Sequence, residues 1–129
     1  MDTVAQFLTR VRNAGVARHE KVDVPASNFR VGLAEILADK GFIRSFKVAK
    51  DSKQGVMRVY LRYSEGGEHA ITNIQRVSRP GRRVYVKSTD IPVVRSGMGM
   101  TIISTSQGLM SGDDAKKNNL GGELICKVW

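Results

Sequence analysis

A short polar stretch near the middle of the chain, Ser64-Glu65-Gly66-Gly67-Glu68, separates two halves whose sequence patterns differ. Its glycines and small polar side chains favour a turn or a linker over a buried element. The half before it alternates helical and strand patterns, whereas the half after it carries mostly short strand patterns. We therefore predict an α/β (α+β) protein of two small domains, residues 1–66 and residues 67–129. A chain of 129 residues is long enough for two such cores.

The N-terminal half has the pattern α-β-α-β-β. Apolar residues recur at helical spacing in two segments, one that is expected to stop at Gly15 and one that starts after an N-cap at Ser27. The last two strands, which a polar loop joins, are expected to form a hairpin. Alternating apolar and polar residues predict the strands at residues 21–24, 42–48 and 57–63.

The C-terminal half is predicted to be mainly β with short helices. One helix is expected to start at Asp90-Ile91-Pro92 and another after Ser111, because first-turn proline and capping residues stand there. The short strands are expected at residues 70–74, 83–86, 100–104 and 123–128.

The charge of the chain indicates the class of its partner. Lysine and arginine number 21 against 12 aspartate and glutamate, which gives a net charge of +9. The excess is present in both halves, since residues 1–66 hold 12 basic and 7 acidic side chains. A soluble protein this basic usually faces a polyanion. The apolar runs are too short to span a membrane, the N-terminus carries no secretion signal, and the single Cys126 fits a reducing compartment, so we expect a cytoplasmic protein.

Three consecutive hydroxyl side chains follow the predicted strand that begins at Met100, and a glycine after them allows a tight turn. Hydroxyl groups donate and accept hydrogen bonds without carrying charge. A row of them at a strand end can therefore bind base edges, ribose 2′-OH groups and phosphates. The alternative is a polar turn whose hydroxyls cap its own backbone. The residues of this hydroxyl loop are Ser104, Thr105, Ser106 and Gly108.

A basic arm lies at residues 76–87, which hold five basic side chains and no acidic one. Pro80-Gly81 predicts a turn that displays the arginines between two extended segments. Guanidinium groups suit phosphate oxygens, and a tyrosine ring can stack on a base. A solvated charged hairpin is the alternative. The candidate RNA-binding residues of the arm are Arg79, Arg82, Arg83, Tyr85 and Lys87.

The sequence gives little support for an enzyme. It has no nucleophile elbow, phosphate-binding loop or paired-cysteine metal motif. His19 and His69 stand alone in polar surroundings and are interpreted as surface residues. Glu123 is better suited to accept a hydrogen bond from a base amino group or from an arginine than to act as a general base. We predict no cofactor and no metal.

Several of these motifs, taken together and in this order, resemble the family of small-subunit ribosomal protein eight in its bacterial form. The resemblance extends along the whole chain, but Gln107 and Lys127 stand where a lysine and an apolar or aromatic residue are usual. The motifs are Leu8-Thr9-Arg10-Val11-Arg12-Asn13, Phe42-Ile43, Ser78-Arg79-Pro80-Gly81 with Arg83 and Tyr85, Ser104-Thr105-Ser106 with Gly108 and Met110, and Gly121-Gly122-Glu123 with Ile125-Cys126.

This resemblance implies a non-catalytic protein of the small ribosomal subunit that binds the central domain of 16S rRNA and helps to assemble the platform of the 30S subunit. It implies small-subunit proteins five and twelve as neighbours, and the protein's own operon mRNA as a further RNA partner. The implied C-terminal RNA contacts are Ser104, Thr105, Ser106, Gly108, Tyr85, Lys87 and Glu123. The implied N-terminal contacts are Arg10, Arg12, Asn13, Ser27 and Arg30.

Two other classes of function stay open from the residues alone. One is a free-standing RNA-binding translational regulator that acts off the ribosome, and the other is a basic enzyme acting on nucleic acid. Arg10 and Arg12 also have a purely structural interpretation, because cations near the end of a helix interact favourably with its dipole.

Overall fold

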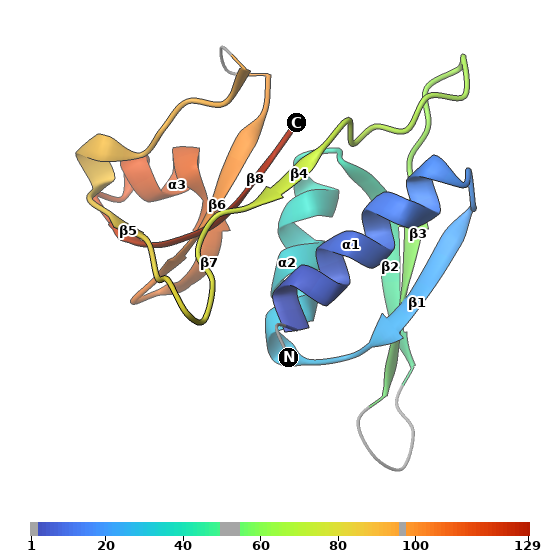
Figure 1. Cartoon of the computed structure of the whole chain (residues 1–129), viewed down its shortest axis with the longest axis horizontal. Coiled ribbons are helices and arrows are strands. Elements are labelled where there is room, and N and C mark those ends of the chain that lie inside the picture. The colour runs from blue at the N-terminus through green and yellow to red at the C-terminus, as the bar shows by residue number, and fades with distance from the viewer. Residues whose placement is uncertain (1–2, 50–54, 96–97) are drawn as a thin grey trace. The chain divides into compact units, whose positions relative to one another are not determined.

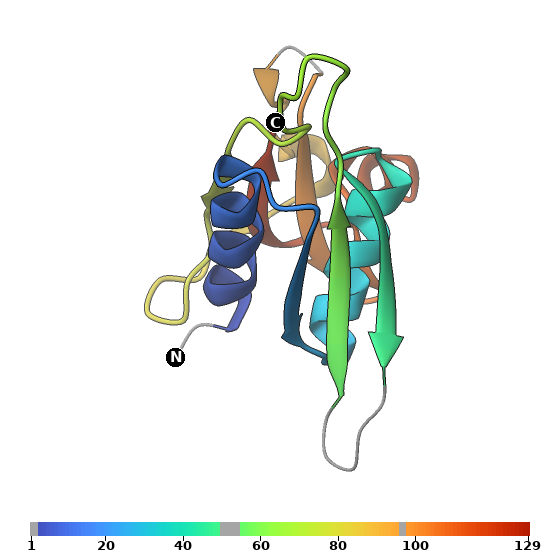
Figure 2. The same ribbon diagram turned by 90° about the vertical axis from the view of Figure 1, so that its right-hand side faces the viewer.

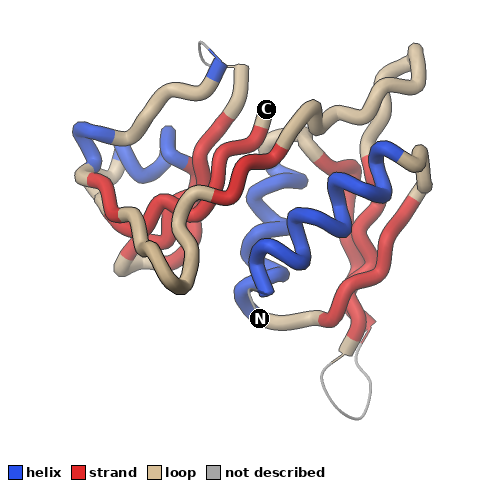
Figure 3. The backbone as a smooth tube through the Cα atoms, in the orientation of Figure 1, coloured by secondary structure: helices blue, strands red, loops and turns tan. Residues whose placement is uncertain are grey.

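The structure of the protein is a computed structural model that describes residues 3–49, 55–95 and 98–129 (Figure 1). Contacts between Cα atoms group the chain into two compact units, unit 1 (residues 3–72) and unit 2 (residues 73–129). Each unit has its own sheet. Both units combine helices with a sheet, so the predicted α+β class is confirmed (Figure 3).

Unit 1 has the predicted order α-β-α-β-β. Its strands form an antiparallel sheet in the order β1-β3-β2, and both helices lie on one side of that sheet (Figures 1 and 2). The polar loop predicted between the last two strands lies largely outside the described residues. The elements are α1 Thr3–Val16, β1 Lys21–Pro25, α2 Asn28–Asp39, β2 Ile43–Ala49 and β3 Val56–Leu61.

Strict alternation along β1 and β3 gives this sheet one covered and one open face. Val24, Met57 and Val59 are almost completely buried beneath the helices. Their sequence neighbours Asp23 and Arg58 are exposed on the other face. Because successive side chains of a strand point to opposite faces, the alternating sequence is sufficient to set this arrangement.

The end of α1 differs from the prediction. The helix passes through Gly15 and ends at Val16, and Arg18 takes the left-handed backbone conformation, with φ 59°, that closes it. Glycine is required at position 15 because a side chain there would have no room, and not because the helix ends there. A Cβ atom added there would stand 1.9 Å from Nδ1 of His69, so the imidazole ring occupies the place of a side chain. His69 is thus half-buried against α1, and its interpretation as a surface residue is wrong.

The polar stretch around Gly66 and Gly67 forms a tight turn in which the chain folds back on itself. Tyr63 and His69 form an isolated antiparallel bridge, and the Ala70 amide donates to the Arg62 carbonyl at 2.8 Å. These bonds tie residues 68–70 to the end of β3. The contacts of unit 1 therefore continue past the turn to Thr72.

Unit 2 contains an antiparallel five-stranded sheet. The strands follow the order β4-β8-β6-β7, and β5 also pairs with β8. The predicted helix start at Asp90-Ile91-Pro92 is wrong, because a 3₁₀ turn ends at Asp90 and irregular chain follows (Figure 3). The elements are β4 Ile74–Arg76, β5 Tyr85–Val86, the 3₁₀ turn η1 Ser88–Asp90, β6 Met100–Thr105, β7 Gly108–Ser111, α3 Gly112–Lys117 and β8 Gly122–Val128.

The core of unit 2 lies between α3 and one face of this sheet. Ile103 and Leu124 from the sheet pack with Ala115 of α3 and with Ile91. Ser111 starts the helix as predicted, since its Oγ accepts a hydrogen bond from the Asp114 amide at 3.3 Å. The opposite face of the sheet carries mainly polar residues at the end where β5 and β7 lie. The candidate site is on this part of the face.

Candidate nucleic-acid interface

Four residues on four different strands form a row across the sheet of unit 2. Glu123 of β8 pairs directly with Tyr85 of β5 on one side and with Ser104 of β6 on the other, and Ser104 pairs in turn with Leu109 of β7. Directly paired residues in antiparallel strands project from the same face of a sheet. The next row, which includes Ile103 and Leu124, points into the core. The row of Tyr85, Glu123, Ser104 and Leu109 therefore lies on the face opposite α3.

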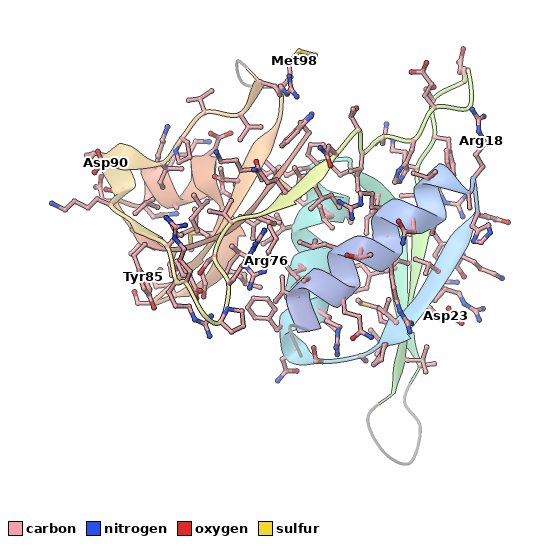
Figure 4. The ribbon with its side chains drawn as sticks, in the orientation of Figure 1. Arg18, Asp23, Arg76, Tyr85, Asp90 and Met98 are labelled. Carbon is pink, nitrogen blue, oxygen red and sulfur yellow. The ribbon has the colours of Figure 1, made fainter. Side chains whose placement is uncertain are left out.

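Tyr85 is the most accessible member of this row. Its side chain is 69% exposed and projects away from the ribbon (Figure 4). Lys87 follows two residues later in extended backbone and is also exposed, so the alternation of the strand places it on the same side. A ring and an ammonium group thus stand side by side at one end of the row, where they can contact a base and a phosphate.

The three hydroxyls of the loop do not have equivalent roles. Oγ1 of Thr105 donates to the Gly108 carbonyl at 2.8 Å and accepts from the Gln107 amide at 3.1 Å, so it holds the turn together. Gly108 has φ 107°, a conformation that glycine adopts without strain. None of the described residues forms a hydrogen bond with the hydroxyl of Ser104 or Ser106. Both hydroxyls are therefore available to a partner.

Two adjacent glycines bring the strands of the site together. A Cβ atom on Gly122 would lie 2.1 Å from the Ser104 carbonyl oxygen, and one on Gly121 would lie 2.5 Å from the Val86 carbonyl oxygen. Only residues without a side chain allow the backbones to approach this closely. The glycine pair before Glu123 is the sequence signal for this contact.

The tip of the basic arm is a tight hairpin. The Arg79 amide donates to the Arg82 carbonyl at 3.1 Å, and the Arg82 amide donates back to the Arg79 carbonyl at 2.9 Å. Pro80 and Gly81 form the turn between them, as predicted. Both arginines are exposed, and a Cβ atom on Gly81 would meet nothing within 4 Å. The tip therefore presents two guanidinium groups to solvent.

The base of the arm is held by a network in which an arginine bonds Glu123, as the sequence indicated, and in which the role of Ser78 was not predicted. Oγ of Ser78, a fully buried residue, donates to the Glu123 carboxylate and accepts from the Val84 amide at 3.2 Å. Arg83 donates to the same carboxylate at 2.9 Å. Burial alone would raise the pKa of Glu123, but the hydrogen bonds from Ser78 and Arg83 outweigh it and hold that pKa below its ordinary value. Glu123 thus connects the arm to β8 as an ionised carboxylate.

The N-terminal candidates lie in unit 1. Arg10, Arg12 and Asn13 are exposed on α1, and Arg10 donates to the Asp23 carbonyl at 3.0 Å. Ser27 is the N-cap of α2, because its Oγ accepts from the Arg30 amide at 3.1 Å. Arg30 itself is buried, with 7% of its surface exposed. Within this set, the exposed positions are the ones on α1.

Three further observations concern other kinds of site. Within the described residues, no group of three or more histidine, cysteine, aspartate or glutamate side chains could hold a metal ion. No helix in the described part of the chain is long and apolar enough to cross a membrane.

Burial raises the pKa of the Cys126 thiol to about 12. Such a thiol suits the buried hydrophobic role predicted for Cys126 and not the role of a nucleophile.

Comparison with known proteins identifies the family. The family model described as Ribosomal protein S8 matches residues 2–129. The small ribosomal subunit protein uS8 of Bdellovibrio bacteriovorus is 70% identical over 129 residues, which is the full length of both chains. The proteins of the same name from Geotalea daltonii and Streptococcus uberis are each 52% identical over 128 residues, covering 99% of this chain and 97% of theirs. The chain therefore belongs to the ribosomal protein S8 family, as its motifs indicated.

Proposed function

We propose that the protein is a structural constituent of the small ribosomal subunit and that it binds the central domain of 16S rRNA. The relatives are named as small ribosomal subunit proteins, and a member of a ribosomal protein family is a structural protein and not an enzyme. The observation that carries the RNA-binding part is the row on the open face of unit 2. There Tyr85 and Ser104 stand on either side of Glu123, beside the unpaired hydroxyl of Ser106.

The residues of this face divide between two tasks. Arg79, Arg82 and Lys87 supply charge for phosphate oxygens, which positions the protein on RNA without reading its sequence. Ser104 and Ser106 supply uncharged hydrogen bonds to base edges and 2′-OH groups, which distinguish one folded RNA from another. Tyr85 offers a ring for an unstacked base. Glu123 and Arg83 hold the arm in place, and Thr105 and Gly108 hold the turn.

The proposal gives unit 1 a supporting role. Arg10, Arg12 and Asn13 on the exposed side of α1 would contact a second stretch of the rRNA, with Ser27 and Arg30 supporting the start of α2. Most of the recognition is assigned to the second of the two predicted domains, residues 67–129, whose first residues belong to unit 1 by their contacts. Small-subunit proteins five and twelve would be neighbours within the cytoplasmic subunit.

Co-sedimentation with small ribosomal subunits tests the proposal. The protein should stay with the subunit after washing at high salt, because the uncharged contacts and burial within the particle do not depend on counterion release. The double variant Ser104→Ala/Ser106→Ala should be lost in the same wash. A protein that leaves the subunit at high salt but stays bound to a fragment of its own operon mRNA would instead be a regulator that acts off the ribosome.

A further inference from the structure

The open face of the unit 1 sheet is a basic surface that the proposed rRNA contacts do not use. Strand register defines its composition. One row across the sheet is Lys21, Tyr60 and Ser45, and the next row is Asp23, Arg58 and Lys47. Directly paired residues share a face, and the residues between them in sequence, which are the buried Val59 and the half-buried Val22 and Phe46, project from the other face. The side chains of these two rows therefore point to the side that no helix of unit 1 covers (Figure 2).

The cations on this face are gathered around one aromatic ring. The guanidinium carbon of Arg44 lies 5.3 Å from the centre of the Tyr60 ring, and Nζ of Lys47 lies 5.8 Å from it. Both distances are within the range of a cation–π interaction. Such contacts restrict two long side chains that would otherwise move freely, so part of the ordering needed to bind an anion has already taken place.

Half of the four cations on this face have no ion-pair partner among the described residues. Arg58 is paired with Asp23 through two hydrogen bonds, of 2.8 and 3.1 Å. Arg44 has only a distant and exposed partner, Glu20, at 3.8 Å. In the part of the chain that the structure describes, no carboxylate lies within ion-pair distance of Lys21 or Lys47. Two lysines thus remain without an ion-pair partner among the described residues, beside an Arg44 whose single pair is exposed.

The surface is also hollowed. A groove of about 480 Å³ opens beside Lys47, Arg58 and Tyr60, and its lining is completed by Asp23, Val48, Ala49 and Val56. Lys47 at this groove, with Lys21 and Arg44 on the same face, can meet the phosphates of an RNA backbone, because lysine and guanidinium groups both suit phosphate oxygens. Tyr60 is itself flanked by cations, so we expect it to orient them and not to stack on a base.

We propose that this face, the Lys21/Arg44/Lys47/Tyr60 surface, binds the phosphate backbone of a second RNA segment, without reading its sequence. The proposal rests on the proposed function, because a protein within an RNA particle meets such segments. Charge complementarity carries the choice of occupant. An acidic peptide with an apolar side chain is the competing occupant, since Val56, which lines the groove, is 40% exposed.

The test uses the full chain labelled with ¹⁵N and already saturated with an rRNA hairpin from the central domain. A short RNA duplex of unrelated sequence is then added, and in a separate sample an oligoglutamate peptide of similar charge. The duplex should shift the amide signals of Lys21, Ser45 and Lys47 while leaving those of Ser106 and Gly108 in their hairpin-bound positions. Binding of the duplex should be clearly tighter than that of the peptide.

The variant Arg44→Gln/Lys47→Gln provides the quantitative test. Its affinity for the duplex should fall about tenfold at low salt, and the slope of log K against log salt should become shallower by about two, since each cation answers roughly one phosphate. Lys116→Gln/Lys117→Gln removes the same charge from the exposed end of α3 and should leave both quantities unchanged.

The possible results separate cleanly. Amide shifts on this face that are lost in the Arg44/Lys47 variant support the proposal. A peptide that binds this face as tightly as the duplex overturns it in favour of an acidic protein partner, and the absence of shifts with either probe overturns it altogether. If the first hairpin fails to shift Ser106 and Gly108, the proposed function fails instead, whatever the sheet face of unit 1 does.

Discussion

At the scale of single residues, the hydroxyl loop combines one structural and two available side chains. Thr105 uses both hydrogen-bonding capacities of its hydroxyl inside the turn, whereas Ser106 is exposed and makes no hydrogen bond with the described residues. The two neighbours should therefore respond to mutation in opposite ways. Mutation of Thr105 should affect folding, and mutation of Ser106 should affect RNA binding.

Ser106→Ala and Thr105→Val test this division. Ser106→Ala should change the free energy of unfolding by no more than about 0.5 kcal/mol, as surface substitutions generally do. It should weaken binding to the rRNA fragment about tenfold, because an RNA group buried without a partner costs roughly 1–3 kcal/mol. Thr105→Val keeps the volume but should lower stability by about 1 kcal/mol. Thermal unfolding and RNA titration of both variants provide the measurements, and a Ser106→Ala variant that binds like the wild type would make the loop a structural cap.

Gly122 and Gly81 form a second matched pair within unit 2. Gly122→Ala places a Cβ atom 2.1 Å from a backbone oxygen of β6, which cannot move without separating the strands. We expect a loss of about 2–3 kcal/mol in unfolding free energy, at the upper end of the cost of overpacking. Gly81→Ala adds its Cβ atom to open space at the arm tip and should be nearly neutral. Equal effects in chemical denaturation would show that β6 and β8 are not held as closely as described.

At the scale of elements, the arm depends on a contact that joins residues far apart in the sequence. Ser78 and Glu123 are separated by 45 positions, and the buried hydroxyl of Ser78 bonds both to that carboxylate and to the Val84 amide. The arm is thereby fixed to β8 at its base while its tip stays exposed. Binding by Arg79 and Arg82 then starts from an ordered display, which reduces the entropy lost on association.

Ser78→Ala should expose this dependence. The variant leaves the Val84 amide and the Glu123 carboxylate each without one partner, so the unfolding free energy should fall by about 1–3 kcal/mol. Affinity for cognate and unrelated RNA should fall by similar factors, because the arm contacts phosphates and not bases. The measurement is RNA titration with both RNAs, under conditions in which circular dichroism shows the variant folded. A loss confined to the cognate RNA would mean that the arm reads bases.

The packing of α1 against the turn at residues 62–70 predicts that the unfolding free energy depends on pH. Burial lowers the pKa of His69, whose Nε2 is buried without a hydrogen-bond partner among the described residues. Below the unfolded pKa of about 6.5 the unfolded chain binds a proton that the folded chain does not, so stability is complete above that pH and falls as the pH decreases. His69→Phe keeps a ring against Gly15 and should flatten this decline in unfolding free energy between neutral and mildly acidic pH. An unchanged slope would assign the decline to other groups.

Sequence periodicity was sufficient to predict the elements of unit 1, because buried and exposed positions alternate along β1 and β3. Val24, Met57 and Val59 are the buried positions of this alternation. It failed where a residue's role depends on a distant partner. Gly15 has the composition of a helix stop, but its role is set by His69, 54 positions later. In the candidate site, the pattern could find the hydroxyls but not the division between Thr105 and Ser106. That division depends on the geometry of one turn.

At the scale of the whole molecule, the chain carries basic surface on two separately folded units. Ser104, Ser106 and the arm lie on unit 2, whereas Arg10, Arg12 and the proposed Lys21/Arg44/Lys47/Tyr60 surface lie on unit 1. Two binding units on one chain raise each other's effective concentration, so several modest contacts can give tight binding overall. A net charge of +9 makes such binding sensitive to salt, and the uncharged hydroxyls provide the part that is not.

A salt titration can measure whether the open face of unit 2 recognises a particular folded RNA by uncharged contacts. The affinity of the full chain is measured from low to high salt for a fragment of the 16S rRNA central domain and for an unrelated RNA duplex of equal length. Phosphate contacts weaken equally for both RNAs as salt rises, whereas hydroxyl and stacking contacts exist only with the cognate fragment. The ratio of the two affinities should be maintained at high salt, and Ser104→Ala/Ser106→Ala should reduce it sharply. Two curves that converge on one affinity as the salt increases would contradict it.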